Sequence, residues 1–262
     1  MHAIALQWSI RRMDPEANMG MAADLLRASS PQPGDLIVLP ELWPTGYSSG
    51  DRLAGAATEH GGRWSSFCAD LASSHGVIIA GTVPARTDNA LTNRLLVSGP
   101  EGTLGYYDKI HLFPPMREQQ LFVPGTRADP IPLPGGPVMG PVICYDVRFP
   151  ELFRLLALRG ATVFVMPSQF PDPKEDLWHI FLASRAAENQ AYLVACNRTG
   201  ESGSFTFFGS SAVYDPLGRC LGRLGREEGY LKVTIDPAVV VETRDALPVL
   251  PHARLSLEVK TP

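Results

Sequence analysis

The sequence has few cysteines and no cluster of metal-binding residues. Among 262 residues there are four cysteines, Cys68, Cys144, Cys196 and Cys220, with no Cys-x-x-Cys pair, and six histidines with no His-x-x-x-His pair. This spacing argues against a structural zinc site and against a disulfide framework. We therefore predict no bound metal and a reduced, cytoplasmic protein.

The sequence also lacks the features of proteins that bind nucleic acids, membranes or nucleotides. Its 23 Lys and Arg against 27 Asp and Glu give a formal net charge of −4, without a basic stripe that would neutralise a run of phosphates. No apolar run reaches the roughly 18 residues of a membrane span, and the first residues do not resemble a signal peptide. No glycine-rich phosphate-binding motif occurs. We expect no nucleic acid, membrane or nucleotide partner.

Alternating apolar runs and helical patterns predict a single α/β domain. With 45% hydrophobic residues, the chain can bury a full-sized core. The order of elements predicts strands alternating with helices, with an antiparallel hairpin in the middle. Predicted strands cover 3–8, 35–40, 77–81, 138–143, 161–166 and 191–195, predicted helices 15–27, 62–75, 150–158 and 177–190, and the hairpin 95–97 with 104–110. Residues 1–236 form the predicted domain, and 237–262 a C-terminal extension without a strong pattern.

Cys144 is the candidate nucleophile. It follows the apolar strand 140–143 and precedes a turn into a helix, so its sulfur is expected at the sheet edge near amides of the helix N-terminus. That setting favours a thiolate. The alternative is a buried structural cysteine, which is how we interpret Cys68 and Cys196; Cys220 follows a turn.

A cysteine nucleophile needs a base, and Glu41 is the first candidate. It ends the apolar strand 35–40, where partial desolvation raises a carboxyl pKa enough for it to accept a thiol proton. His111 and His179 are alternative bases. Lys109, also at a strand end, provides a positive charge that lowers the thiol pKa and binds an oxyanion. Taken singly, Glu41 could equally cap a loop, and Lys109 could be a solvated surface residue.

Together these residues lie in segments that resemble the nitrilase superfamily of carbon–nitrogen hydrolases. The resemblance extends from the first strand to about Asp236, and it implies a four-layer α-β-β-α sandwich. The segments are V-L-P-E-L-W-P-T-G-Y (38–47), Y-Y-D-K-I-H-L-F (106–113), V-I-C-Y-D-V-R-F-P-E-L (142–152) and S-R-A-A-E-N-Q-A-Y (184–192).

The resemblance also implies a set of catalytic roles. Glu41 would be the general base, Lys109 would stabilise the tetrahedral intermediate, and Cys144 would form a thioester with the acyl group. The backbone N–H of Tyr145 would complete the oxyanion hole, and Glu118 matches a second glutamate of many members. The reaction needs no metal or organic cofactor, and the family leads us to expect a homodimer or a higher homo-oligomer.

Arg148 lies four residues after the nucleophile, in the segment C-Y-D-V-R-F-P-E. This segment resembles the branch of the family that contains ω-amidases and deaminated-glutathione amidases. The Arg148 guanidinium is suited to bidentate capture of a substrate carboxylate, unless it pairs with Asp146 or Glu151. Tyr47 matches a substrate-side tyrosine of ω-amidases, or simply packs the wall of the site.

The sequence therefore predicts hydrolysis of a small amide substrate, a 2-oxo acid ω-amide such as 2-oxoglutaramate or 2-oxosuccinamate. The alternatives within the enzyme class are a deaminated-glutathione amidase and a broad aliphatic amidase. The alternative from a different class is an inactive binding protein on the same fold.

Overall fold

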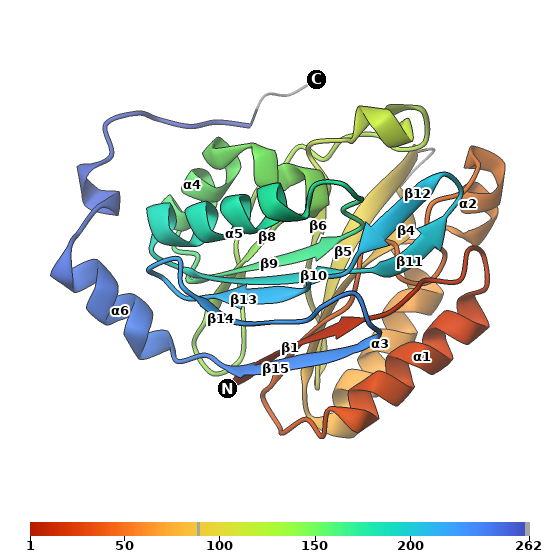
Figure 1. Cartoon of the computed structure of the whole chain (residues 1–262), viewed down its shortest axis with the longest axis horizontal. Coiled ribbons are helices and arrows are strands. Elements are labelled where there is room, and N and C mark those ends of the chain that lie inside the picture. The colour runs from red at the N-terminus through yellow and green to blue at the C-terminus, as the bar shows by residue number, and fades with distance from the viewer. Residues whose placement is uncertain (88–89, 260–262) are drawn as a thin grey trace.

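The computed structural model describes residues 1–87 and 90–259 and arranges them as two stacked β-sheets (Figure 1). In the first sheet the strand order is β15-β1-β2-β4-β5-β6, with β3 paired to β4. Parallel pairing of β1, β2 and β4 is followed by the predicted antiparallel hairpin of β5 and β6. The strands are β1 (His2–Gln7), β2 (Leu36–Val38), β3 (Thr58–Glu59), β4 (Ile78–Thr87), β5 (Ala90–Gly99), β6 (Gly102–Asp108) and β15 (Gly229–Thr234).

The second sheet has the strand order β14-β13-β10-β9-β8-β7, with β8, β9 and β10 parallel. A separate hairpin of β11 and β12 extends beyond it. These strands are β7 (Ile131–Pro132), β8 (Val138–Pro141), β9 (Val163–Ser168), β10 (Tyr192–Asn197), β11 (Thr199–Ser202), β12 (Phe205–Phe208), β13 (Ala212–Tyr214) and β14 (Cys220–Arg223).

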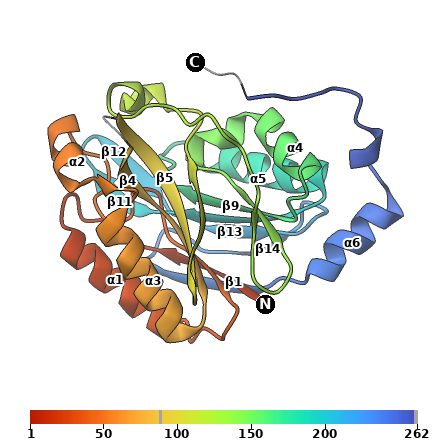
Figure 2. The same ribbon diagram turned by 180° about the vertical axis from the view of Figure 1, so that it is seen from behind.

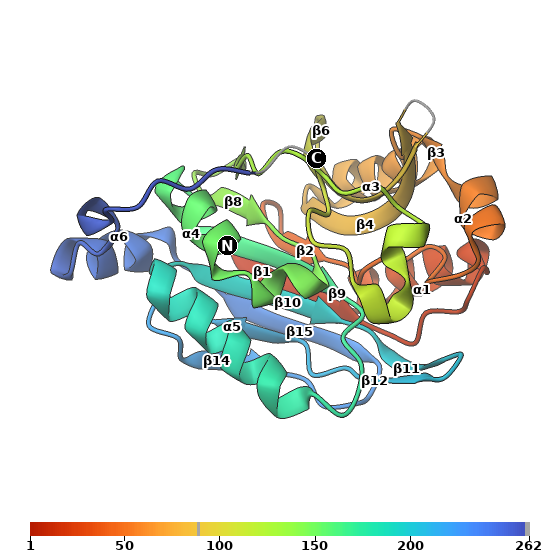
Figure 3. The ribbon, with the colours of Figure 1, turned by 90° about the horizontal axis from the view of Figure 1, so that it is seen from above.

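Helices cover the outer face of each sheet, which completes the predicted four layers. Helices α1 (Pro15–Ala28) and α3 (Gly62–His75) lie outside the first sheet, and α5 (Glu175–Asn189) lies at the opposite side of the stack (Figure 3). Helix α4 (Pro150–Leu158) packs beside α5, and the short α2 (Gly50–Ala56) precedes β3 (Figure 2). The α-β-β-α sandwich is confirmed.

Alternating side chains of β1 explain why the strands read as continuous apolar runs. Ala3 and Ala5 contribute to the core between the two sheets, whereas Ile4 and Leu6 belong to the cluster that includes residues of α1 and α3. A strand buried on both faces is therefore mostly apolar in its sequence. Glu41 and Cys144 follow such strands, and the candidate site forms where these strands end.

The C-terminal segment contains a helix that the sequence pattern did not predict. Helix α6 (Pro237–Ala246) begins after Asp236, whose side chain accepts a hydrogen bond from the Ala238 N–H, and stands away from the sheets (Figure 1). Of its residues only Val240 is buried, so the helix lacks the apolar stripe by which amphipathic helices are recognised. Residues 260–262 of the predicted extension lie outside the described residues.

Candidate active site

Four predicted site residues, Glu41, Lys109, Glu118 and Cys144, meet where strands of the two sheets end. Glu41 follows β2, Lys109 follows β6 directly, and Cys144 begins a short 3-10 helix (Cys144–Arg148) soon after β8. Glu118 begins another 3-10 turn in the long loop after β6. All four are buried, and the two glutamates and the lysine have no exposed surface.

Glu41 is held by hydrogen bonds to both carboxylate oxygens. Its Oε1 accepts from Lys109 Nζ at 2.7 Å, from Asn93 Nδ2 at 2.8 Å and from the Tyr47 hydroxyl at 2.8 Å. Its Oε2 accepts from the backbone N–H of Gln169 at 2.9 Å. A carboxylate with this many donors keeps one position and orientation.

Lys109 lies between two carboxylates. Its Nζ is 2.7 Å from Glu41 and 2.9 Å from Glu118. Burial alone would lower the pKa of Lys109, but the charges of Glu118 and Glu41 raise it above its ordinary value. Burial raises the pKa of Glu118, against the opposing charge of Lys109. The ammonium is therefore permanently charged at neutral pH, while a proton on Glu118 is favoured relative to a solvated glutamate.

Cys144 has a strained backbone and a thiol that is difficult to ionise. Its φ of +44° lies in the left-handed region, which non-glycine residues occupy mainly where the surroundings enforce it. Burial raises the pKa of the Cys144 thiol well above its usual value, and the Glu41 charge adds to this. Lys109 lowers the pKa, as predicted, but does not outweigh burial. The thiol thus needs a base to remove its proton.

Tyr47 belongs to the carboxylate network as well as to the wall of a cavity. Its hydroxyl lies within hydrogen-bonding distance of Glu41 and of Glu118. Burial, followed by these two negative charges, raises the pKa of Tyr47 well above its usual value. The hydroxyl therefore stays protonated and donates to a carboxylate of the site.

Tyr145 and Arg148 lie on the Cys144 side of the site. As second residue of its 3-10 helix, Tyr145 has a backbone N–H without an acceptor inside that helix. Arg148 is half-buried, with its guanidinium 5.1 Å from the ring centre of Phe181. Among the described residues the structure shows no ion pair of Arg148 with Asp146 or Glu151, and Asp146 lies beside His111 instead.

Asp146 has other partners, and His111 is one of them. Its carboxylate accepts hydrogen bonds from the Tyr107 hydroxyl at 2.8 Å and the Ile143 N–H at 2.8 Å, and it lies 2.8 Å from His111 Nδ1. His179 lies between Ser210 and Tyr214. The structure gives neither histidine a contact with Cys144, so neither is placed to act as its base.

Asn93 and Gln169 were missed by the sequence analysis although both bind Glu41. Asn93 lies inside β5, and Gln169 follows β9, donating its side-chain amide to the Glu41 carbonyl at 2.7 Å. Gln169 could have been predicted as a site residue, because it is a polar residue directly after a buried parallel strand. Asn93 could not have been predicted, because polar residues are common within strands.

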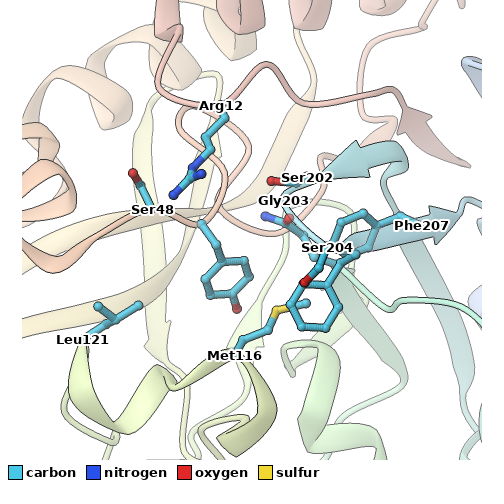
Figure 4. A pocket seen from close by; sticks show the side chains of 11 residues that line it. Arg12, Ser48, Met116, Leu121, Ser202, Gly203, Ser204 and Phe207 are labelled. Atoms are coloured by element: carbon cyan, nitrogen blue, oxygen red, sulfur yellow. The ribbon is translucent and has the colours of Figure 1, made fainter.

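Two cavities border this network. A narrow one of about 10 Å³ is lined by Cys144, Tyr145 and Arg148 together with Phe113, Phe170 and Lys174. A larger one of about 230 Å³ is lined by Tyr47, Gln169, Met116, Leu121 and the tip of the β11–β12 hairpin (Figure 4). Gln169 borders the larger cavity, and the next residue, Phe170, borders the narrow one.

Within the described parts of the chain, no group of three or more His, Cys, Asp or Glu side chains is arranged to hold a metal ion. Likewise, none of the helices in those parts is long and apolar enough to cross a membrane.

Comparison with known proteins identifies the family. Residues 3–245 match the carbon–nitrogen hydrolase family. The chain belongs to this family. It is 37% identical to the 2-oxoglutaramate amidase of Bacillus subtilis over 254 residues, which cover 96% of this chain and 97% of that one.

Solved carbon–nitrogen hydrolases have the same fold. XC1258 from Xanthomonas campestris is 28% identical and superimposes with a TM-score of 0.90 over 98% of both chains. An amidase from Nesterenkonia sp. AN1, solved with acrylamide added at its active-site cysteine, is 29% identical with a TM-score of 0.81, over 95% of this chain and 98% of that one.

Proposed function

We propose that this carbon–nitrogen hydrolase cleaves the terminal amide of a small carboxylated substrate, a 2-oxo acid ω-amide such as 2-oxoglutaramate or 2-oxosuccinamate. The products are the dicarboxylate and ammonia. The observation that carries the proposal is the buried network of Glu41, Lys109 and Glu118 beside Cys144. The likeness to a 2-oxoglutaramate amidase supports the substrate.

The first half-reaction acylates Cys144. Glu41 removes the thiol proton as the sulfur attacks the amide carbon, and the carbonyl oxygen gains negative charge. Lys109 Nζ and the Tyr145 N–H stabilise that oxygen. Glu41 then passes the proton to the nitrogen, the C–N bond breaks, and ammonia leaves a thioester on Cys144. The raised thiol pKa supports this role for Glu41, because the free thiol does not ionise unaided at neutral pH.

The second half-reaction hydrolyses the thioester. Glu41 takes a proton from a water molecule whose oxygen attacks the acyl carbon. The C–S bond breaks, the acid is released, and the proton returns to the sulfur. Glu118 and Tyr47 act as positioning residues, since they hold Lys109 and Glu41 through both steps. One water is consumed for each amide cleaved.

Arg148 binds the substrate carboxylate in this proposal. Support comes from its position in the same narrow cavity as Cys144 and from its lack of an acidic partner among the described residues. A guanidinium left without a partner at half-burial is available to a carboxylate ligand.

Three further assignments belong to the proposal. Residues 1–236 form the hydrolase domain, followed by a C-terminal extension. The protein is a cytoplasmic enzyme, in agreement with four cysteines that are all free thiols. It assembles as a homodimer or a higher homo-oligomer, the state expected from the family resemblance.

Ammonia release from a panel of ω-amides with and without a free carboxylate tests the proposed function. We expect carboxylated amides to be preferred by the wild type, no release by Cys144→Ala, and loss of the preference in Arg148→Gln. Arg219→Gln, which changes an exposed arginine in the β13–β14 turn, serves as the control. Equal turnover of neutral amides would favour a broad aliphatic amidase, and ammonia release independent of Cys144 would contradict the proposal.

A further inference from the structure

Asp146 is a buried carboxylate that the proposed reaction does not use. It follows the proposed nucleophile by two residues and has no exposed surface. Burying a carboxylate is costly unless hydrogen bonds satisfy its oxygens. The donors that satisfy Asp146 therefore show which parts of the site it holds together.

Asp146 closes the turn that carries Cys144. Its Oδ2 accepts a hydrogen bond from the Ile143 N–H at 2.8 Å, and its own N–H donates to the Ile143 carbonyl at 2.9 Å. Cys144 and Tyr145 lie between these two hydrogen-bonded residues. The φ of +44° at Cys144 is unfavourable for a non-glycine residue and persists only where the surroundings enforce it. The pair of hydrogen bonds between Ile143 and Asp146 is such a constraint.

The same carboxylate binds the segment that carries Lys109. Its Oδ2 also accepts from the Tyr107 hydroxyl at 2.8 Å, and its Oδ1 accepts from the His111 N–H at 3.1 Å and lies 2.8 Å from His111 Nδ1. Tyr107 precedes Lys109 by two residues, and His111 follows it by two. Burial, followed by the charge of Asp146, raises the pKa of Tyr107 well above its usual value, so this hydroxyl stays protonated and donates. Asp146 is thus bound to the chain on both sides of Lys109.

We propose that Asp146 is a positioning residue that fixes Cys144 relative to Lys109. The two residues come from different sheets, since Lys109 follows β6 of the first sheet and Cys144 comes soon after β8 of the second. One carboxylate bonded to both segments keeps the sulfur and the ammonium at a constant separation while the tetrahedral intermediate forms. The inference rests on the roles proposed above for Cys144 and Lys109.

Asp146→Asn tests this role, because an amide cannot replace both carboxylate oxygens. Its NH2 group faces either the Ile143 N–H or the His111 N–H, so one of these donors loses its acceptor. A displacement of about 1 Å in an active site costs about 100-fold in rate, and we expect kcat at saturating 2-oxoglutaramate to fall by about that factor. The variant should also unfold at a lower denaturant concentration than the wild type.

Asp35→Asn is the matched control, because Asp35 is a buried aspartate with the same kinds of partners at the opposite end of β2 from Glu41. Asp35 is 1% exposed, and its carboxylate accepts from the N–H groups of His2 and Gln32 and lies 3.0 Å from His2 Nδ1. This variant should also unfold at a lower denaturant concentration but retain the kcat of the wild type. An equal loss of kcat in both variants, or an unchanged kcat in Asp146→Asn, would overturn the inference.

Tyr107→Phe is a milder variant that removes one hydrogen bond to Asp146 and retains its charge. We expect kcat to fall about tenfold, the lower end for one hydrogen bond to a charged group. Tyr192→Phe is its control: the Tyr192 hydroxyl accepts from the Asp236 N–H at 3.3 Å, much as the Tyr107 hydroxyl accepts from the Ile110 N–H at 3.2 Å. The control should retain kcat. Two tyrosine variants with the same kcat would contradict the positioning role.

Alkylation of Cys144 separates failure of this inference from failure of the proposed function, because it needs no substrate. In a Cys220→Ser background at pH 7, iodoacetamide should label Cys144 about tenfold more slowly in Asp146→Asn, since the displaced thiol moves away from Glu41, its proposed base. Unfolding would expose the thiol and speed labelling, so a slower rate reports its position. Slower labelling in Asp146→Asn but not in Asp35→Asn supports the inference even if no ω-amide is hydrolysed. Unchanged or faster labelling contradicts it, even if ω-amides are hydrolysed as proposed.

Discussion

Cys144 and Cys196 are two buried thiols associated with the same sheet, yet their surroundings differ in charge and backbone geometry. Cys196 lies within β10, and its thiol donates to the Leu6 carbonyl at 3.0 Å. Cys144 lies beyond the end of β8, with a positive φ and with Glu41 and Lys109 as charged neighbours. Burial raises the pKa of both thiols. Burial therefore does not distinguish a nucleophile from a core residue; the neighbouring base and cation do.

The largest expected effect comes from removing the cation of this charged network. In Lys109→Met the carboxylates of Glu41 and Glu118 face each other without a counter-charge. Breaking a buried ion pair by removing one partner typically costs about 3–5 kcal/mol, so we expect the free energy of unfolding at pH 7 to fall by that amount. Activity is lost with it, because the oxyanion then lacks its charged partner. Denaturant unfolding and ammonia release measure the two effects.

The pH dependence of the free energy of unfolding identifies why Lys109→Met is less stable than the wild type. Burial raises the Glu118 pKa in the wild type while Lys109 opposes the shift, so removing Lys109 raises this pKa further. A carboxyl with a raised folded-state pKa binds its proton more tightly in the folded than in the unfolded state, so stability rises as pH falls toward the unfolded value. The deficit of Lys109→Met should shrink between pH 7 and pH 5. A deficit that does not change with pH would contradict this cause.

Arg27→Met is the control for that experiment. Arg27 pairs with Asp24 at 2.9 Å, and both side chains are about 70% exposed. Exposed pairs of this kind contribute about 0–1 kcal/mol. We expect a small change in the free energy of unfolding.

The second prediction is that Cys144 loses reactivity, and so becomes more like Cys196, when Glu41 is replaced. Alkylation at pH 7 is followed in a Cys220→Ser background, because Cys220 is the exposed cysteine. Cys144 should react while Cys68, whose pKa burial raises to about 12, and Cys196 remain unlabelled. Glu41→Gln should slow labelling of Cys144 by about 100-fold, the lower range for loss of a general base. Mass spectrometry of the labelled peptides gives the rates, and labelling unaffected by Glu41→Gln would exclude it as the base.

The alternation of apolar runs and helical patterns predicted an α/β domain, and the resemblance to the nitrilase superfamily implied its four layers. Glu41 and Cys144 each follow a buried strand that appears in the sequence as an apolar run, so a charged or nucleophilic residue at its end is conspicuous. Lys109 follows the partly exposed β6 and was found from its position at the end of the predicted hairpin. The network around them could not be predicted in this way. Glu118 binds Lys109 from a loop without periodicity, and the engagement of Tyr47 with two carboxylates depends on how that loop folds back.

The pKa of the Cys144 thiol could not be predicted from the sequence either. It depends on a balance between burial and neighbouring charges, which the spacing of residues does not reveal. The sequence indicated that Lys109 would lower the pKa of the Cys144 thiol, and it does, but burial of the thiol raises this pKa and has the larger effect. The same applies to the surroundings of Arg148, since spacing does not reveal that Asp146, one of its candidate partners, accepts hydrogen bonds from Tyr107 and Ile143.

The smallest expected effect comes from replacing Asn93. The experiment tests whether its side chain holds Glu41 in position or only packs within β5. Asn93→Ala removes the 2.8 Å hydrogen bond to Glu41 while Lys109, Tyr47 and Gln169 continue to hold it. A hydrogen bond to a charged group contributes roughly 1.5–3 kcal/mol, and the remaining donors compensate in part, so we expect kcat to fall about tenfold.

Thr92→Val is the matched control, because the adjacent Thr92 points to the opposite face of β5 and its buried hydroxyl has no partner in the described chain. That variant should retain wild-type kcat and lose no stability. If the two variants behave alike, Asn93 contributes to packing and not to the position of Glu41.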